Sequence, residues 1–138
     1  MQDFRFVSSL LPTEANQLRL TALWLFPQEA PFQPITQKEE EVASQLSIRR
    51  SLEYRHSRGY VRHALAGLWD VCPLDIPLKA LPGQPPMLEK GWGSVSFSHS
   101  RDALLVGWSP FRLGVDVENS DRSFSSKLIV NRYFCREE

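Results

Sequence analysis

Two short stretches near residue 100 contain side chains that could bind a divalent metal ion. The first reads F-S-H-S and places His99 between two serines at the end of an expected strand. The second reads G-V-D-V-E, so that Asp116 and Glu118 alternate with Val115 and Val117. Alternate residues of a strand point to the same side and lie about 6 to 7 Å apart along the backbone. The two carboxylates would therefore share one face, on which a divalent cation could bind.

Both stretches also have a purely structural interpretation. The hydroxyls of Ser98 and Ser100 could satisfy backbone groups at the end of the strand, with His99 as a hydrogen-bonded structural residue between them. Asp116 and Glu118 could be charged side chains that face solvent. Taken singly, each motif favours the structural alternative, and only their combination favours a functional site.

A basic stripe on an expected helix over Arg49–Val71 is the third candidate group. Arg55, Arg58 and Arg62 follow one another at intervals of three and four residues, so they lie on one side of the helix. Guanidinium groups donate paired hydrogen bonds that fit phosphate oxygens. The alternative is a solvated helix face whose arginine stems cover the edge of the core. Taken alone, the stripe favours this alternative.

Hydrophobic pattern and helix-capping residues predict the elements in the first half of the chain. A largely buried strand is expected over Leu18–Phe26, which ends at Pro27. Thr36 stands three residues before Glu39, the spacing of a capping box, so a helix should begin there and run toward Leu46. The long helix carries apolar residues at helical spacing, and they predict its core face: Tyr54, Val61, Leu65 and Leu68.

The second half is predicted to supply most of a sheet. A segment rich in proline between residues 73 and 86 predicts an irregular connection with room for one short strand. Three strands are then expected, and their short connections favour an antiparallel meander: Ser94–Ser98, Ala103–Trp108 and Leu113–Val117. A last helix should begin near Ser123 or Ser125.

Composition and charge describe an ordinary globular chain. The 138 residues are 42% hydrophobic and 23% charged, with 16 basic and 16 acidic side chains, so nothing global indicates a nucleic-acid partner. Cys72 and Cys135 lack C-x-x-C spacing and predict reduced thiols. The longest apolar run, Ala22–Phe26, is too short for a signal peptide or a membrane span. We expect a cytoplasmic protein without a membrane partner.

Three motifs occur in an order that resembles one enzyme family. They are F-S-H-S, G-V-D-V-E and R-Y-F-C-R-E-E, and they follow the helical stretch S-R-G-Y-V-R and a G-x-P turn at Gly83 to Pro85. From Leu20 onward the chain resembles the large, surfactin-synthetase-activating type of 4'-phosphopantetheinyl transferase. The resemblance implies an α+β fold in which residues 1–118 form the first half of a pseudo-dimer, an antiparallel sheet packed with a long helix. Residues 119–138 would begin the second half.

The resemblance also implies an activity and residue roles. Members of this family transfer the phosphopantetheine arm of coenzyme A to a serine of an acyl or peptidyl carrier protein, with Mg²⁺, and release 3',5'-ADP. By position, Asp116 and Glu118 would be the magnesium ligands. His99 would be a catalytic and coenzyme-binding residue, and Ser98 would contact the coenzyme beside it. The remaining coenzyme-contact candidates are Arg58, then Arg50, Arg55 and Arg62, and Gln84 in the turn.

The sequence departs from the family pattern at two points. Gln84 stands where the family turn has a lysine, so the side chain brings a hydrogen-bond donor but no positive charge. The sequence ends at Glu138, before the family's W-x-x-K-E motif, whose glutamate is the third metal ligand and general base. We therefore expect a fragment, with little activity of its own.

Two other function classes stay open. A non-catalytic module could bind coenzyme A or a carrier protein without transferring the arm. A nucleotide- or RNA-binding domain built on the arginine helix is the remoter alternative, because the net charge is balanced and no RNP-like aromatic motif is present.

Overall fold

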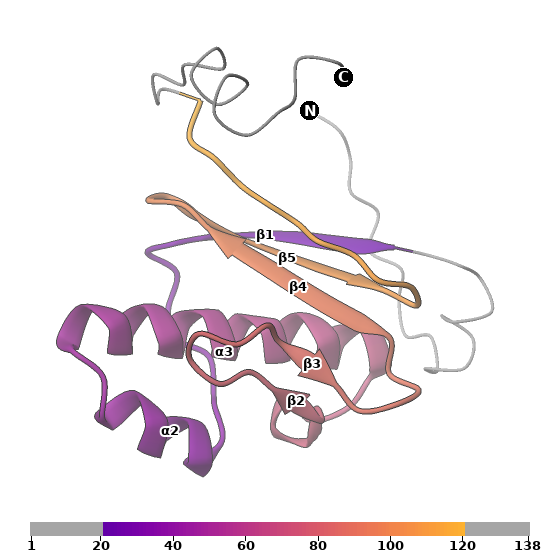
Figure 1. Cartoon of the computed structure of the whole chain (residues 1–138), viewed down its shortest axis with the longest axis horizontal. Helices are drawn as coiled ribbons and strands as arrows, with labels where there is room; N and C mark the ends of the chain where they lie inside the picture. Colours follow the sequence, from indigo (N-terminus) through magenta and orange to yellow (C-terminus); the bar gives the residue numbers. More distant parts are fainter. Residues whose placement is uncertain (1–20, 121–138) are drawn as a thin grey trace, which may run out of the picture.

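A small antiparallel sheet and two helices make a mixed α+β fold in the computed structural model, which describes residues 21–120 (Figure 1). The elements, in chain order, are β1 (Ala22–Pro27), α2 (Gln37–Ser44), α3 (Ile48–Trp69), the 3-10 turn η1 (Pro73–Asp75), β2 (Leu78–Lys79), β3 (Met87–Leu88), β4 (Ser94–His99) and β5 (Ala103–Ser109). The predicted strands at 94–98 and 103–108 and the predicted long helix are confirmed.

The main sheet has the strand order β1-β5-β4, with β5 antiparallel to both neighbours. One row of paired residues runs across it from Trp24 through Val106 to Phe97. Because side chains alternate along each strand, this row and its neighbours on the same side face α3. Leu104 and Val106 are fully buried there, as expected for the central strand.

The long helix α3 lies under this face of the sheet (Figure 1). The predicted core face of the helix is confirmed, since Tyr54, Val61, Leu65 and Leu68 are all buried. Near the C-terminal end of the helix, the ring of Trp69 meets Trp92 and Trp108 edge-on, at centroid distances of 4.7 and 5.7 Å. Such aromatic contacts fix one end of the helix against the sheet.

The predicted capping box begins α2. The Thr36 hydroxyl accepts a hydrogen bond from the Glu39 backbone N–H at 3.3 Å, and Glu39 Oε2 accepts one from the Thr36 N–H at 2.8 Å. Two donors at the helix start are thereby satisfied. The helix ends at Ser44, slightly before the predicted end.

The proline-rich connection contains η1 and the two-residue strands β2 and β3, which pair as a hairpin. Within it the Gln84 N–H donates to the Leu81 carbonyl at 3.1 Å, and Gly83 has φ of 76°. Proline before a glycine with positive φ is the pattern of a type II turn. The turn that carries Gln84 is thus defined by local sequence.

The third predicted strand, Leu113–Val117, is wrong. It would complete a meander by pairing with β5, but β1 already occupies that edge of β5. The segment instead runs, extended, over the sheet face opposite α3, where Val115 packs above Gly107 (Figure 1). An ideal Cβ on Gly107 would lie 2.6 Å from a Val115 methyl, so only glycine admits this approach.

Several expectations fall outside the described residues: the start of the first strand before residue 21, the helix near Ser123, and the R-Y-F-C-R-E-E stretch. Between residues 21 and 120, no helix combines the length and the apolarity that a membrane span needs.

Candidate functional site

The segment that carries Asp116 and Glu118 is held by serine hydroxyls of β4. Ser96 Oγ accepts a hydrogen bond from the Val115 N–H at 3.2 Å, and Ser98 Oγ accepts one from the Val117 N–H at 3.3 Å. Ser96 and Ser98 alternate along β4, so both point to the face opposite α3. The two serines on either side of Phe97 are therefore a local sequence signal that the segment at 115–117 binds to β4. Ser96 was not among the predicted site residues.

Asp116 and Glu118 lie on the outer side of this segment. Residues 113, 115 and 117 are half-buried, whereas 114, 116 and 118 are exposed. The shared orientation that alternation predicted for the two carboxylates therefore holds, although the segment is not a strand of the sheet.

Ser98 and Asp116 are brought into direct contact. The Ser98 hydroxyl donates to Asp116 Oδ1 at 2.7 Å, and the Val117 N–H donates to the same oxygen at 2.9 Å. Two donors on one oxygen fix the carboxylate plane, and Oδ2 accepts no hydrogen bond from any residue between 21 and 120. Oδ2 is therefore available to a cation, with Ser98 orienting the ligand from behind.

The donor set suits a hard cation only in part. Carboxylate oxygens are the ligands that Mg²⁺ prefers, and one or two of them commonly suffice when phosphate and water complete the shell. Within the described range, no three His, Cys, Asp or Glu side chains are close enough to hold a metal together. Asp116 and Glu118 would thus supply two carboxylates at most, and any further ligands would have to come from water, phosphate or residues outside the described range.

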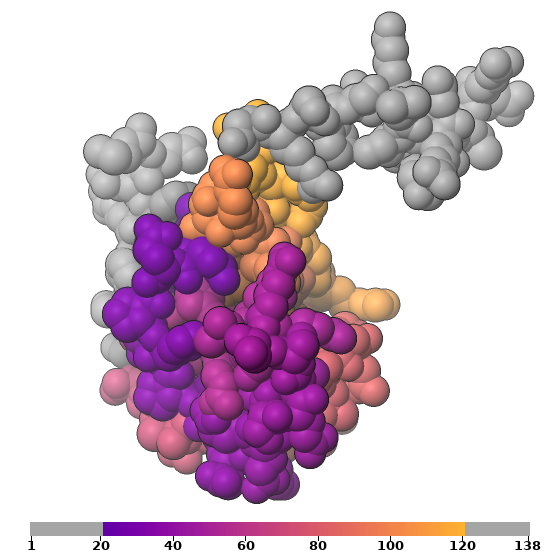
Figure 2. All heavy atoms as spheres, turned by 90° about the vertical axis from the view of Figure 1, so that its left-hand side faces the viewer, coloured from indigo at the N-terminus to yellow at the C-terminus, as the bar shows by residue number. Residues whose placement is uncertain are grey.

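His99 points to the other side of the sheet. It alternates with Ser98 along β4, and its row runs through Leu104 to Phe26, on the face toward α3. His99 and Asp116 therefore lie on opposite faces and share only the end of the sheet. Figure 2 looks onto this end, where the loop after β1 (indigo), the first turns of α3 (magenta) and the turn between β4 and β5 (orange) come together.

A second histidine on that side, His56, escaped the sequence interpretation. It is 4% exposed, and its Nε2 finds no hydrogen-bond partner within residues 21–120. Burial lowers the pKa of His56, a hydrogen bond with the Pro27 carbonyl raises it, and the charge of His99 lowers it. His56 lies between Arg55 and Arg58 in the sequence, and these charged neighbours gave no indication that its side chain would be buried.

The arginine stripe is mostly committed to the fold. Arg62 is 3% exposed and forms a two-pronged ion pair with Glu39, with Nε–Oε2 and Nη2–Oε1 distances of 2.8 and 3.0 Å. Its Nη1 donates to the carbonyls of Pro73 and Ile76. Arg62 thus joins α2, α3 and η1, and the structural alternative describes it.

Arg58 is also buried, at 6% exposure. Its Nε and Nη2 both donate to the Ala80 carbonyl, at 2.9 and 2.7 Å, and the guanidinium lies over the rings of Tyr54 and Phe97. Burial lowers the pKa of Arg58, against the opposing effect of Tyr54. Arg58 therefore anchors the end of β2 just before the Gln84 turn.

The other predicted coenzyme contacts lie nearer the surface. Arg55 is half-buried and forms an ion pair with Glu40 of α2. Arg50 is exposed, and no described residue binds its guanidinium. Gln84 is exposed at the last position of its turn. Of the four helix arginines that were predicted as coenzyme contacts, Arg50 keeps the most freedom to meet a ligand.

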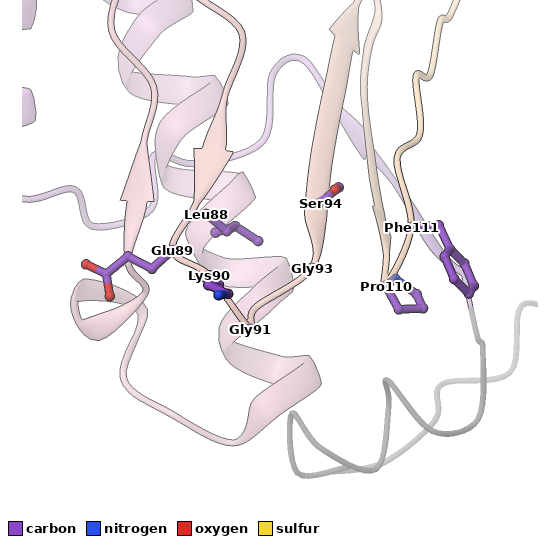
Figure 3. A pocket seen from close by; sticks show the side chains of 8 residues that line it. All are labelled: Leu88, Glu89, Lys90, Gly91, Gly93, Ser94, Pro110 and Phe111. Atoms are coloured by element: carbon purple, nitrogen blue, oxygen red, sulfur yellow. The ribbon is translucent and has the colours of Figure 1, made fainter.

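A shallow hollow of about 400 Å³ lies at the opposite end of the sheet, where β4 begins (Figure 3). It is lined by Leu88, Glu89, Lys90, Gly91, Gly93, Ser94, Pro110 and Phe111. None of the predicted site residues belongs to it, and its lining carries one acid and one base.

No protein-family model matches the chain, and neither the curated proteins nor the solved structures contain a match.

Proposed function

We propose that this chain carries the magnesium and coenzyme A portion of a 4'-phosphopantetheinyl transferase site. In the complete reaction, a serine of an acyl or peptidyl carrier protein would receive the phosphopantetheine arm and 3',5'-ADP would leave. The observation that supports this most is the 2.7 Å hydrogen bond from Ser98 to Asp116, which joins two motifs that the family resemblance treats as one site.

Asp116 and Glu118 are the proposed metal ligands because they face outward together. A bound Mg²⁺ would supply positive charge against the pyrophosphate of coenzyme A. Ser98 orients Asp116 through the hydrogen bond that it donates to Oδ1. This is an outer-shell role, and the direct coenzyme contact that the resemblance implies for Ser98 stands beside it as a prediction.

His99 is the proposed phosphate contact at the same end of the sheet, on its other face. Arg50 is exposed and can add a cation there. Arg58 supports the site indirectly, since it holds Ala80 at the base of the turn that presents Gln84. A ligand that passes around the end of the sheet would meet both faces.

The transfer reaction is tested by intact-mass spectrometry of an apo carrier protein incubated with coenzyme A, Mg²⁺ and the gene product. A mass gain of one phosphopantetheine arm is expected, and its loss in Asp116→Ala would tie the reaction to the proposed ligand. Glu41→Ala, on the exposed side of α2, is a matched control that should leave the gain unchanged. Absence of any gain with the full gene product refutes the proposed transfer.

A coenzyme A or carrier-protein binding module is the second candidate. It is favoured by the commitment of Arg58 and Arg62 to the fold, which leaves fewer cations for a reacting phosphate. Calorimetry with coenzyme A, with and without Mg²⁺, separates the two functions. Binding without transfer would support the module.

A further inference from the structure

His56 presents a buried hydrogen-bonding atom for which the described fold supplies no partner. Its ring hydrogen-bonds to the Pro27 carbonyl, which accepts and so requires a ring N–H. Since Nε2 is the nitrogen without a partner, the proton lies on Nδ1. Nε2 is then an acceptor, and buried acceptors in native proteins are normally paired.

The rings in contact with His56 cannot pair with Nε2. Phe32 meets it edge-on at 6.3 Å and has no polar hydrogen. Tyr60 lies 4.9 Å away, but its hydroxyl donates to the Pro31 carbonyl at 2.7 Å. A donor must therefore come from another element.

The strand β4 runs over α3 in the direction that brings His99 to His56. Trp92, before the strand, contacts Trp69, and Phe97 further along lies over Arg58, so β4 and α3 run antiparallel. Two strand residues span about 6.6 Å, which equals about four residues of a helix. His99, two residues after Phe97 and on the same side, thus comes over the turn of α3 that contains His56.

The row across the sheet gives the same placement. His99 pairs with Leu104, which pairs with Phe26. The Phe26 ring contacts Tyr60 at 4.5 Å, and Tyr60 contacts His56. Both routes place the exposed His99 side chain at the edge of the pocket of rings around His56.

We propose that His56 positions His99, by accepting at Nε2 a hydrogen bond from the His99 ring and so directing the other ring nitrogen of His99 outward. The inference rests on the proposed function insofar as the outward nitrogen, once it takes up a proton, is the one that would donate to a coenzyme phosphate. His56 itself touches no ligand.

The surroundings of His56 keep it in the accepting form. It faces the Pro27 carbonyl at the end of β1, Phe32 in the loop after β1, Tyr60 of α3 and His99 of β4. Burial opposes a second proton on the ring and so keeps Nε2 unprotonated. His56 therefore stays the acceptor of the proposed pair.

The test is long-range ¹H–¹⁵N NMR of the histidine rings in the 138-residue chain at pH 7.5. We expect a single tautomer for His99 in the unaltered protein. His56→Phe keeps the ring contacts but has no acceptor, so His99 should become a mixture of tautomers. His56→Gln can place an amide oxygen near the position of Nε2 and should restore most of the single form.

His63→Gln is the matched control. His63 is exposed, lies on the same helix and contacts the same Tyr60 ring, at 6.0 Å. This variant should leave the His99 tautomer unchanged. A mixed tautomer in the unaltered protein, or a single one that persists in folded His56→Phe, overturns the proposal, and circular dichroism reports whether the variants are folded.

Calorimetry with coenzyme A links the positioning to the proposed function. His56→Phe should weaken binding about 10-fold, the size of effect typical of outer-shell residues. In a His99→Ala background it should cause no further loss, because His56 acts only through His99. Additive losses overturn the positioning role. If the unaltered protein binds no coenzyme A, the proposed function fails, while the tautomer measurement still decides the positioning.

Discussion

Replacement of Arg62 by methionine should cost about 3 to 5 kcal/mol of the free energy of unfolding, the range for breaking a buried ion pair by removing one partner. The side chains of Arg62 and Glu39 are only 3% and 10% exposed. Methionine retains the apolar stem and a similar helix propensity, so the loss reflects the guanidinium. It leaves a buried carboxylate and deprives the Pro73 and Ile76 carbonyls of a donor. Two hydrogen bonds from Thr36 still reach Glu39, which places the cost toward the lower value.

Urea unfolding followed by circular dichroism measures this cost. Arg49→Met is the matched control, because the Arg49–Glu53 pair has side chains 90% and 33% exposed and should contribute less than about 1 kcal/mol. Adding Glu39→Gln to Arg62→Met should recover part of the loss, since no charge then stays buried alone. A cost below about 1 kcal/mol for Arg62→Met would refute the structural role and return Arg62 to the ligand candidates.

Three further predictions concern α3 and the candidate site. Gly59→Ala would place a Cβ 2.5 Å from a backbone oxygen of the loop before α2 and should lower the free energy of unfolding by about 1 to 3 kcal/mol. Gly67→Ala meets nothing within 4 Å and should raise the free energy of unfolding by about 0.5 to 1 kcal/mol. Equal urea midpoints for the two variants would contradict this prediction. Ser98→Ala should weaken Mg²⁺-dependent coenzyme A binding about 10-fold in calorimetry, because Asp116 loses its orienting donor, and undiminished affinity would exclude that role. Burial lowers the pKa of His56, so below pH about 6.5 the unfolded chain binds a proton that the folded chain does not. The free energy of unfolding should therefore be highest above this pH and decrease as the pH is lowered further. His56→Phe should flatten this part of the profile of urea midpoint against pH.

Local patterns in the sequence predicted the elements whose cause is local. The capping box of Thr36 and Glu39 needs only a spacing of three residues, and the core face of α3 needs only helical periodicity. The hairpin of β4 and β5 follows from two alternating stretches with a short connection. The outward orientation of Asp116 and Glu118 follows from alternation in any extended chain.

The missed features depend on segments far apart in the sequence. The stretch at 113–117 has the composition of a strand, but the edge of β5 that it would need is taken by β1, more than 75 residues earlier in the chain. Periodicity placed Arg58 and Arg62 on one helix face, yet could not show that Glu39 and the Ala80 carbonyl would bind them.

The sequence by itself determined the helices, the β4–β5 hairpin and the pair of carboxylates on the stretch from Val115 to Glu118, because each depends on neighbours within a few residues. Only the tertiary structure decided which side chains could form a site. It joined Ser98 to Asp116 across 18 positions, placed His99 on the opposite face of the sheet, and buried His56 with an unpaired nitrogen. Packing of β1 against β5 and of α3 beneath the sheet causes these arrangements, and contacts of that kind leave no local pattern in the chain.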